Sequence, residues 1–273
     1  MRSLLILLLS GAIAPLHAFE LQPLWTTTGL RNPESVIAAT DGASLFVSNV
    51  DGEADARDGR GGISRLSLDG TVMAADWATG LHAPKGMAIV GDRLFVSDID
   101  ALAEIDLADG RVLARHPAEG AGFLNDVAIA PDGAVLASDS ARARIYAWRN
   151  GAMETWLEHD LLRAVNGLLP EPSRLVVSTM QGRLLAVDWA TKHVTVLAEG
   201  LGDGDGVAAL GEGRYLVSEW PGRLFQVAAN GSSEVLLDTR AEKRYLNDFL
   251  LLGDILYMPN MEPGALGAYR LRE

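Results

Sequence analysis

Six polar residues that could share one binding site recur along the chain at a nearly constant spacing. Each stands before a short apolar segment, and successive copies are 51, 40, 41, 39 and 42 residues apart. The six positions are Glu34, Lys85, Asn125, Asn166, Asp205 and Asn247. Two carboxylates and three amide carbonyls are hard oxygen donors, which calcium, magnesium and manganese prefer as ligands. If these groups converge, they indicate binding of one divalent cation able to polarise a carbonyl and activate water.

Two other interpretations of the same residues remain open. Asn-Gly and Asp-Gly pairs, as at Asn166 and Asp205, are ordinary turn residues and require no ligand. Lys85 could instead pair with Glu34 on an adjacent repeat, and that ion pair would take the place of a cation.

The segments that must position these residues are repeated as well. Each polar residue leads into an apolar strand, a turn and a second strand, such as residues 94–97 or 175–178. A third and a fourth strand follow, for example residues 183–187 and 194–197. Four short strands in about 40 residues are typical of a propeller blade. We therefore predict an all-β, six-bladed β-propeller; a pair of β-sandwiches would not explain a sixfold repeat.

The ends of the chain and the first repeat refine this prediction. The last repeat, from Leu246, has room for only three strands, so we expect residues 21–28 to supply the fourth and close the ring. The first repeat is longer because residues 51–62 are inserted between its second and third strands. This loop should open on the face where the innermost strands begin, either as a lid over the shaft or as a flexible surface loop.

The first 18 residues have the composition of a signal peptide. Arg2 precedes an apolar run from Leu4 to Leu16, and Ala18 gives a small residue for cleavage. We expect export to the periplasm or secretion, with an uncleaved N-terminal anchor as the alternative. Residues 19–273 would then form a single propeller domain.

The amino-acid composition excludes several classes of binding partner and site. The chain has no cysteine, which excludes disulfides, thiolate metal sites and cysteine nucleophiles. A net charge of −13 argues against nucleic acid, because little would neutralise a phosphate backbone. No membrane partner is expected after cleavage, so a small-molecule ligand is the expected partner; the oligomeric state is left open.

The blade-starting segments resemble those of the regucalcin/gluconolactonase propellers. The similar segments are residues 33–36 (PESV), 124–127 (LNDV), 165–168 (VNGL) and 205–207 (DGV), which occur in the family's order. The resemblance covers nearly the whole mature chain, and the ordered set is more specific than any single motif. It implies one divalent cation, calcium first and magnesium, manganese or zinc as alternatives, held by Glu34, Asn166 and Asp205. It also implies that Asp205 is the general base for attack of water on a lactone carbonyl, and that Asn125 helps to hold the substrate.

One departure from the family bears on the substrate. Sugar-lactone hydrolases of this kind carry an arginine two residues before the first asparagine, where this chain has Phe123. Phenylalanine cannot donate hydrogen bonds to a polyol, so a more apolar ligand is expected. Lys85, Asn247 and Trp220, which follows a second strand on the same face, are the other candidate substrate contacts.

The sequence therefore indicates two alternative functions. The first is an exported, metal-dependent hydrolase of lactones or related cyclic esters, not of a sugar lactone. The second is a non-catalytic propeller that binds a small molecule or a protein across its shaft face. An ion pair between Lys85 and Glu34 would favour the second.

Overall fold

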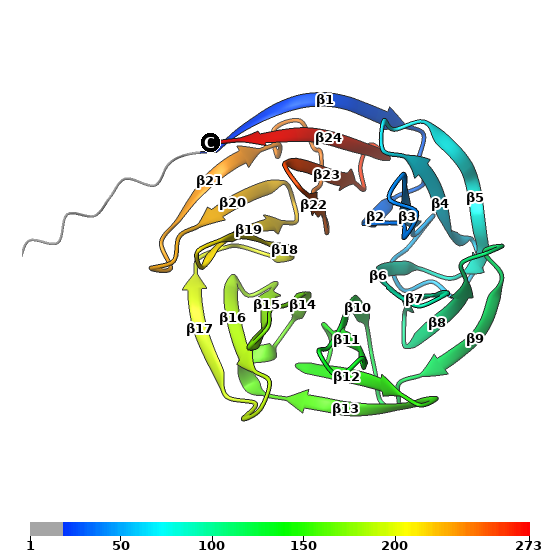
Figure 1. Cartoon of the computed structure of the whole chain (residues 1–273), viewed down its shortest axis with the longest axis horizontal. Helices are drawn as coiled ribbons and strands as arrows, with labels where there is room; N and C mark the ends of the chain where they lie inside the picture. The colour runs from blue at the N-terminus through cyan, green and yellow to red at the C-terminus, as the bar shows by residue number, and fades with distance from the viewer. Residues whose placement is uncertain (1–18) are drawn as a thin grey trace, which may run out of the picture.

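A computed structural model describes residues 19–273 as six four-stranded antiparallel sheets arranged around a central shaft (Figure 1). The first blade comprises β2 (Pro33–Ala38), β3 (Ser44–Asn49), β4 (Gly61–Ser67) and β5 (Val72–Leu81). The second comprises β6 (Pro84–Val90), β7 (Arg93–Asp98), β8 (Ala101–Asp106) and β9 (Val112–Pro117). The third comprises β10 (Leu124–Ile129), β11 (Val135–Asp139), β12 (Arg144–Arg149) and β13 (Ala152–Glu158).

The fourth and fifth blades follow the same plan, in which the innermost strand comes first in the chain. The sixth blade differs only in taking its outermost strand from the N-terminus. The fourth comprises β14 (Val165–Pro170), β15 (Arg174–Thr179), β16 (Arg183–Asp188) and β17 (Val194–Glu199). The fifth comprises β18 (Gly204–Gly211), β19 (Arg214–Glu219), β20 (Arg223–Val227) and β21 (Ser233–Asp238). The sixth comprises β22 (Leu250–Leu252), β23 (Ile255–Asn260), β24 (Ala265–Arg272) and β1 (Glu20–Thr28). The predicted six-bladed propeller is confirmed.

The sixth blade closes the ring as the sequence predicts. Strand β1 lies along β24 at the rim, and the pairing runs from Glu20 with Arg272 to Thr28 with Ala265 (Figure 1). The N-terminal strand therefore covers an edge that would otherwise be open to another chain.

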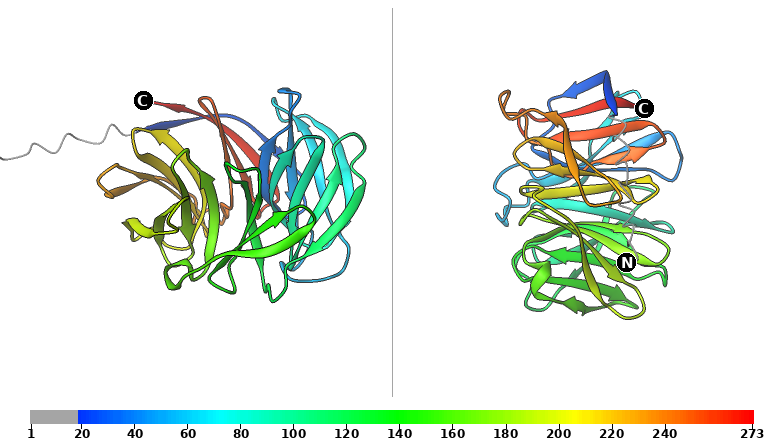
Figure 2. Two further views of the ribbon diagram at one scale, coloured as in Figure 1. Left: turned by 60° about the horizontal axis from the view of Figure 1, so that its bottom comes forward. Right: turned by 90° about the vertical axis from the view of Figure 1, so that its left-hand side faces the viewer.

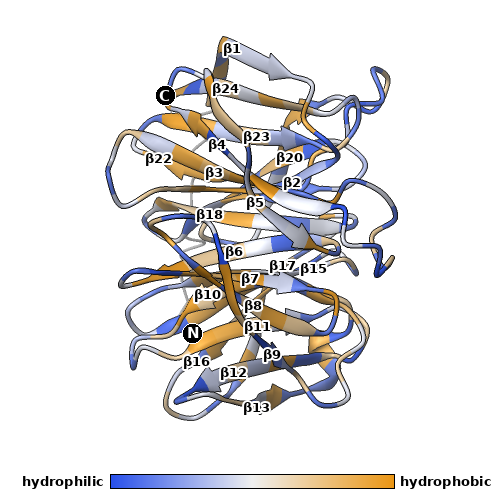
Figure 3. Ribbon diagram, turned by 90° about the vertical axis from the view of Figure 1, so that its right-hand side faces the viewer, coloured by the Kyte–Doolittle hydropathy of each residue, from blue (hydrophilic) through white to orange (hydrophobic). Residues whose placement is uncertain are grey.

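The core lies between adjacent blades, because each blade buries both of its faces. Every residue of β3 is buried, whereas the outer strand β9 alternates between half-buried and exposed residues. One cluster joins Leu136 and Ile145 of the third blade to Leu168 and Leu185 of the fourth. In Figure 3 the inner strands are largely hydrophobic and the connecting loops largely hydrophilic. Burial of apolar surface at six such interfaces stabilises the ring without disulfides.

Apart from the strands, the described chain contains little regular secondary structure. The side views show strands that twist from the shaft towards the rim (Figure 2). One short 3₁₀-helix, Asp160–Leu162, connects the third and fourth blades. In residues 19–273 no helix is long and apolar enough to cross a membrane. The predicted signal peptide, residues 1–18, lies outside the described residues.

Candidate functional site at the mouth of the shaft

The six polar residues singled out by the repeat lie at the start of the innermost strands or, in the sixth blade, just before it. In five blades the residue is the second of its strand, whereas Asn247 lies three residues before β22. All six are buried, with exposed fractions between 2% and 6%. We refer to Glu34, Lys85, Asn125, Asn166, Asp205 and Asn247 as the shaft ring.

A β-bulge at the same point in five blades brings these side chains out of the ladder. In the first blade Pro33 pairs with Asn49 and Val36 with Val47, so one extra residue lies on the inner strand. The second to fifth blades show the same irregularity at the same place. A bulge leaves residues outside the regular pairing and can redirect a side chain, here that of the shaft ring.

The glycines that follow three ring residues do not form turns. Gly86, Gly167 and Gly206 lie inside strands and do not have positive φ. A Cβ atom on Gly167 would lie 2.4 Å from the carbonyl oxygen of Asp205, and one on Gly86 2.5 Å from the Cα of Asp126. The glycines therefore allow neighbouring inner strands to approach closely, and the simple turn interpretation of these pairs is wrong.

Serines near the ends of the second strands hold the backbone of the shaft ring through hydrogen bonds. Ser178 accepts a hydrogen bond from Gly167 N (2.9 Å) and donates to the carbonyl oxygen of Asp205 in the next blade. Ser218 likewise accepts from Gly206 N (2.8 Å) and donates to Asn247 O (2.7 Å). The sequence analysis did not identify these residues, although a serine is the next-to-last residue of the second strand in five blades, at Ser48, Ser97, Ser138, Ser178 and Ser218.

Two further carboxylates, Asp126 and Asp248, stand directly after ring residues and link blades. Asp126 Oδ2 accepts a hydrogen bond from Leu168 N in the fourth blade (2.6 Å). Asp248 Oδ2 accepts one from Ser35 Oγ in the first blade (2.5 Å). Burial raises the pKa of Asp248 to about 6 and that of Asp126 well above its usual range. The sequence analysis missed this pair as well, because only contacts between blades show what the two carboxylates bind.

The two ring carboxylates lie in an environment that disfavours their charged forms. Burial is the main cause that raises the pKa of Glu34, and the nearby charges of Asp205 and Asp248 add to it. Burial also raises the pKa of Asp205, with Asp248 adding to the effect and a hydrogen bond from the Asn166 side chain opposing it. A cation between Glu34 and Asp205 would remove this penalty.

Unpartnered oxygens mark the same place. In the described part of the chain, three buried side-chain oxygens lack a hydrogen-bond partner: Glu34 Oε2, Asp205 Oδ1 and Asn247 Oδ1. All three belong to the shaft ring. A buried acceptor without a donor costs about 1–3 kcal/mol, so these atoms indicate a site for a bound group.

The donor set suits a hard divalent cation held by few carboxylates. No three histidine or acidic side chains within residues 19–273 are grouped to hold a metal ion. A cation here would therefore be bound by Glu34, Asp205 and amide oxygens, which is a set that calcium accepts. Of the predicted ligands, Asn166 lies beside Asp205, to which its side chain donates.

Lys85 does not pair with Glu34 in the described structure. Its Nζ donates to the carbonyl oxygens of Ala54 (2.9 Å) and Ala83 (3.0 Å). The same Nζ lies 4.2 Å from the centre of the Phe123 ring. Lys85 thus connects the mouth of the shaft to the inserted loop of the first blade, and Phe123 lies beside Lys85.

Aromatic side chains border the mouth farther round the ring. Trp220 follows β19, is 38% exposed and packs against Tyr245 with ring centres 5.0 Å apart. Tyr245 stands two residues before Asn247, at the position that Phe123 occupies before Asn125. The polar ring is therefore bordered by apolar surface on two sides.

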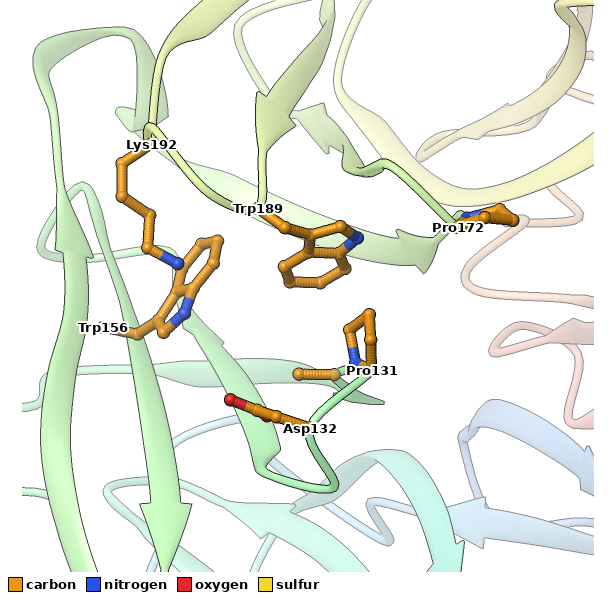
Figure 4. A pocket seen from close by; sticks show the side chains of 7 residues that line it. Pro131, Asp132, Trp156, Pro172, Trp189 and Lys192 are labelled. Carbon is orange, nitrogen blue, oxygen red and sulfur yellow. The ribbon is translucent and has the colours of Figure 1, made fainter.

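A separate small cavity lies between the third and fourth blades, at the turns that follow the inner strands and hence away from the shaft ring. It has a volume of about 190 Å³, and Trp156, Trp189, Pro131 and Pro172 line it (Figure 4). Lys192 covers the Trp156 ring at 3.6 Å. These residues pack against one another between the two blades, and none of them belongs to the shaft ring.

These features define a six-bladed β-propeller with a buried ring of polar side chains, five of which bear oxygen, at the mouth of its shaft. No protein-family model matches the chain, and no curated protein is significantly similar to it in sequence. Three solved structures share the fold with a TM-score of 0.68 each: a streptogramin B lyase, the virginiamycin B lyase of Staphylococcus aureus and a protein described as a proposed gluconolactonase.

The likeness extends over nearly the full length of these proteins. The streptogramin B lyase is 11% identical over 93% of this chain and 98% of its own. The virginiamycin B lyase is 12% identical over 93% and 100%, and the proposed gluconolactonase 18% identical over 94% and 93%. Identities this low establish the fold alone. At that level they support the propeller fold that the repeat in the sequence predicts.

Proposed function

We propose that the chain is a divalent-cation-dependent hydrolase of lactones or related cyclic esters with apolar substituents. The observation that carries this proposal is the pair of buried, unpartnered carboxylate oxygens, Glu34 Oε2 and Asp205 Oδ1, at the mouth of the shaft. Two such groups, on the first and fifth blades, favour a cation, and burial raises the pKa of both because their charged forms are disfavoured without one.

Glu34 and Asp205, together with ring amides, would hold the cation. When bound, it would polarise the ester carbonyl of the substrate and so favour attack on the carbonyl carbon. Calcium fits best because the donors are all oxygen, while magnesium, manganese and zinc remain alternatives.

Asp205 would act as the general base. Its carboxylate accepts a proton from water as the water oxygen bonds to the carbonyl carbon. The ring C–O bond then breaks, and the departing oxygen takes the proton back, which gives the hydroxy acid. Asn125, whose Nδ2 is 3.2 Å from Ser140 Oγ, would orient the substrate beside Asp205.

The border of the mouth supports an apolar substrate. Phe123 and Trp220 offer ring surface, and Lys85 is occupied by backbone carbonyls and by the Phe123 ring. The alternative is a non-catalytic propeller, which a Lys85–Glu34 ion pair would favour. Lys85 Nζ instead donates to two backbone carbonyls, although its charge still lowers the pKa of Glu34. Export to the periplasm or the medium is part of the same proposal and rests on the sequence of residues 1–18.

The test is hydrolysis of a panel of alkyl, aryl and sugar lactones by metal-loaded residues 19–273. We expect activity that a chelator removes and that added calcium restores. The substitution Asp205→Asn should lower kcat/KM by roughly 10²- to 10⁴-fold, because it removes the base. Asp203→Asn, an exposed aspartate just outside the ring, is the matched control and should retain activity. Failure to hydrolyse any lactone, or full activity of Asp205→Asn, would refute the proposal.

A further inference from the structure

The residue that follows the second strand of each blade lies at the mouth of the shaft, next to the shaft ring. We refer to these six residues as the collar: Val50, Ile99, Ser140, Met180, Trp220 and Met261. In five blades the collar residue donates its backbone N–H to the carbonyl oxygen of the residue two before the ring residue. Met180 thus donates to Ala164 (2.9 Å) and Trp220 to Asp203 (3.1 Å).

Five of the six collar residues are apolar, and hydrogen bonds account for the exception. Ser140 Oγ donates to the carbonyl oxygen of Val165 (2.7 Å) and accepts from the Asn125 amide (3.2 Å). Residues that connect strands are ordinarily polar, because their side chains face water. Apolar side chains that recur at one such position round a mouth therefore indicate contact with other apolar groups, of the protein or of a ligand.

Part of the collar is already covered by the protein itself. Val50 and Ile99 are 1% and 4% exposed, and they pack with Ala83 and Met261 in one apolar cluster. These residues belong to the sixth, first and second blades, where the insertion of the first blade contacts Lys85. On this side of the mouth the apolar groups are thus satisfied within the chain.

The collar is open over the fourth and fifth blades, where Met180 is 37% exposed and Trp220 38%. The other exposed large hydrophobic residues of the described chain lie on outermost strands, except Leu252 at the far end of β22. Exposed large apolar side chains at the mouth are therefore confined, within residues 19–273, to these two neighbouring blades.

Met180 and Trp220 stand on either side of one short segment, residues 201–203. Leu201 N donates to the carbonyl oxygen of Gly182, two residues after Met180 (3.1 Å), and Trp220 N donates to that of Asp203. The Trp220 ring also packs against Tyr245. The open apolar surface thus extends from the fourth blade towards the sixth, beside the start of the fifth blade at Asp205.

Two charged residues restrict what can bind at the mouth. Lys85 Nζ lies 4.2 Å from the centre of the Phe123 ring, so one face of that ring is occupied. Asp203, between Met180 and Trp220, is exposed and would repel an anionic group. The open part of the collar therefore suits a neutral apolar group.

We propose that Met180 and Trp220 form a subsite for a neutral apolar substituent of the substrate, an alkyl chain or an aryl group. This inference rests on the proposed function, in which the shaft ring holds the reacting lactone, and it adds where the substituent lies. The substituent crosses the fourth and fifth blades, away from the insertion. Each methylene fully buried there should strengthen binding roughly fourfold.

The test is titration calorimetry of residues 19–273, in calcium, with cyclic amides, which have the shape of lactones and resist hydrolysis. The wild type should bind an n-hexyl δ-lactam roughly tenfold or more tightly than the unsubstituted δ-lactam. Trp220→Ala should weaken binding of the hexyl compound roughly tenfold and Met180→Ala roughly threefold, because each removes apolar contact. Binding of the unsubstituted lactam should stay within about twofold in both variants.

Kinetics on the corresponding lactones gives a second measurement. In both variants the loss for the hexyl lactone should fall on KM, since contact with the substituent is made equally before and during the reaction. Leu113→Ala, which removes a leucine of similar exposure (38%) from the outer strand β9, is the matched control and should change neither affinity.

The outcomes separate the subsite from the reaction. A wild type without preference for the hexyl lactam would overturn the subsite, and so would a preference that survives in both alanine variants or an equal loss for both lactams. If Trp220→Ala does not fold, as judged by circular dichroism, Met180→Glu decides: an unchanged preference for the hexyl lactam overturns the subsite. Preferential lactam binding without lactone hydrolysis would refute the reaction alone, whereas hydrolysis that is indifferent to the substituent would refute the subsite alone.

Discussion

Single buried polar groups carry most of the functional information in this chain. Glu34, Asp205 and Asn247 each keep an oxygen without a partner in a protein whose other buried side-chain oxygens are satisfied, within residues 19–273. Natural proteins rarely tolerate such groups unless a ligand, an ion or water completes them. Lys85 shows the contrast, because it is equally buried and yet fully used by two carbonyls and an aromatic ring.

The side chain of Phe123 is expected to set the preference between apolar and sugar lactones. Phe123→Arg should shift the ratio of kcat/KM for gluconolactone over an alkyl lactone towards the sugar by roughly tenfold or more, because arginine offers hydrogen-bond donors to hydroxyl groups. Competition kinetics on the two lactones measures this ratio. Phe123→Leu should keep the preference of the wild type for the alkyl lactone. A wild type that prefers gluconolactone, or a ratio that does not change in Phe123→Arg, would contradict the prediction.

Strands and loops decide where these groups point. The bulge near the start of five inner strands and the serines of the second strands place the ring residues in the shaft. The insertion of the first blade is tied to the same region, through Ala54 to Lys85 and through an ion pair of Arg57 with Asp100 (2.6 Å). The loop thus contacts Lys85 of the shaft ring and Asp100 of the second blade.

Loss of the Lys85 contact should loosen that loop. In Lys85→Met, backbone amides of residues 51–60 should exchange with solvent roughly tenfold faster, since a hydrogen bond from a charged group is worth about 1.5 kcal/mol or more. Hydrogen–deuterium exchange with mass spectrometry reports this region directly. Lys192→Met removes a lysine that covers Trp156 elsewhere on the ring and should leave the loop unaffected. Equal exchange in the wild type and in Lys85→Met would show that other contacts hold the insertion.

The ring as a whole depends on its closure by the N-terminal strand. Strand β1 pairs with β24 along its length and also reaches the first blade, where Thr27 Oγ1 donates to Gly70 O (2.5 Å). The Trp25 ring packs near Gly70 and lies 5.9 Å from Tyr257. The strand therefore fastens the sixth blade to the first.

Removal of residues 19–28 should consequently destabilise the whole propeller, not one blade. We expect the free energy of unfolding to fall by on the order of 5 kcal/mol, because several apolar side chains lose their burial and β24 becomes an open edge. Urea denaturation compared with residues 19–273 gives the value. Leu24→Ala, at an exposed position of the same strand, should change stability by less than about 0.5 kcal/mol. A truncated protein of unchanged stability would contradict the role assigned to β1.

Sequence reasoning predicted the blade count, the closing strand and the six ring positions, because these follow from a repeat of about 40 residues and from alternation within short strands. It interpreted the glycines at 167 and 206 as possible turn residues and missed the serines at 178 and 218. Those roles arise from the approach of neighbouring inner strands, which no local pattern records. The partner of Lys85 was equally hidden, because it is a backbone carbonyl 31 residues earlier in the insertion. Which ring oxygens lack a partner is decided only when six blades meet at one shaft, since the donors that could reach these oxygens come from neighbouring blades.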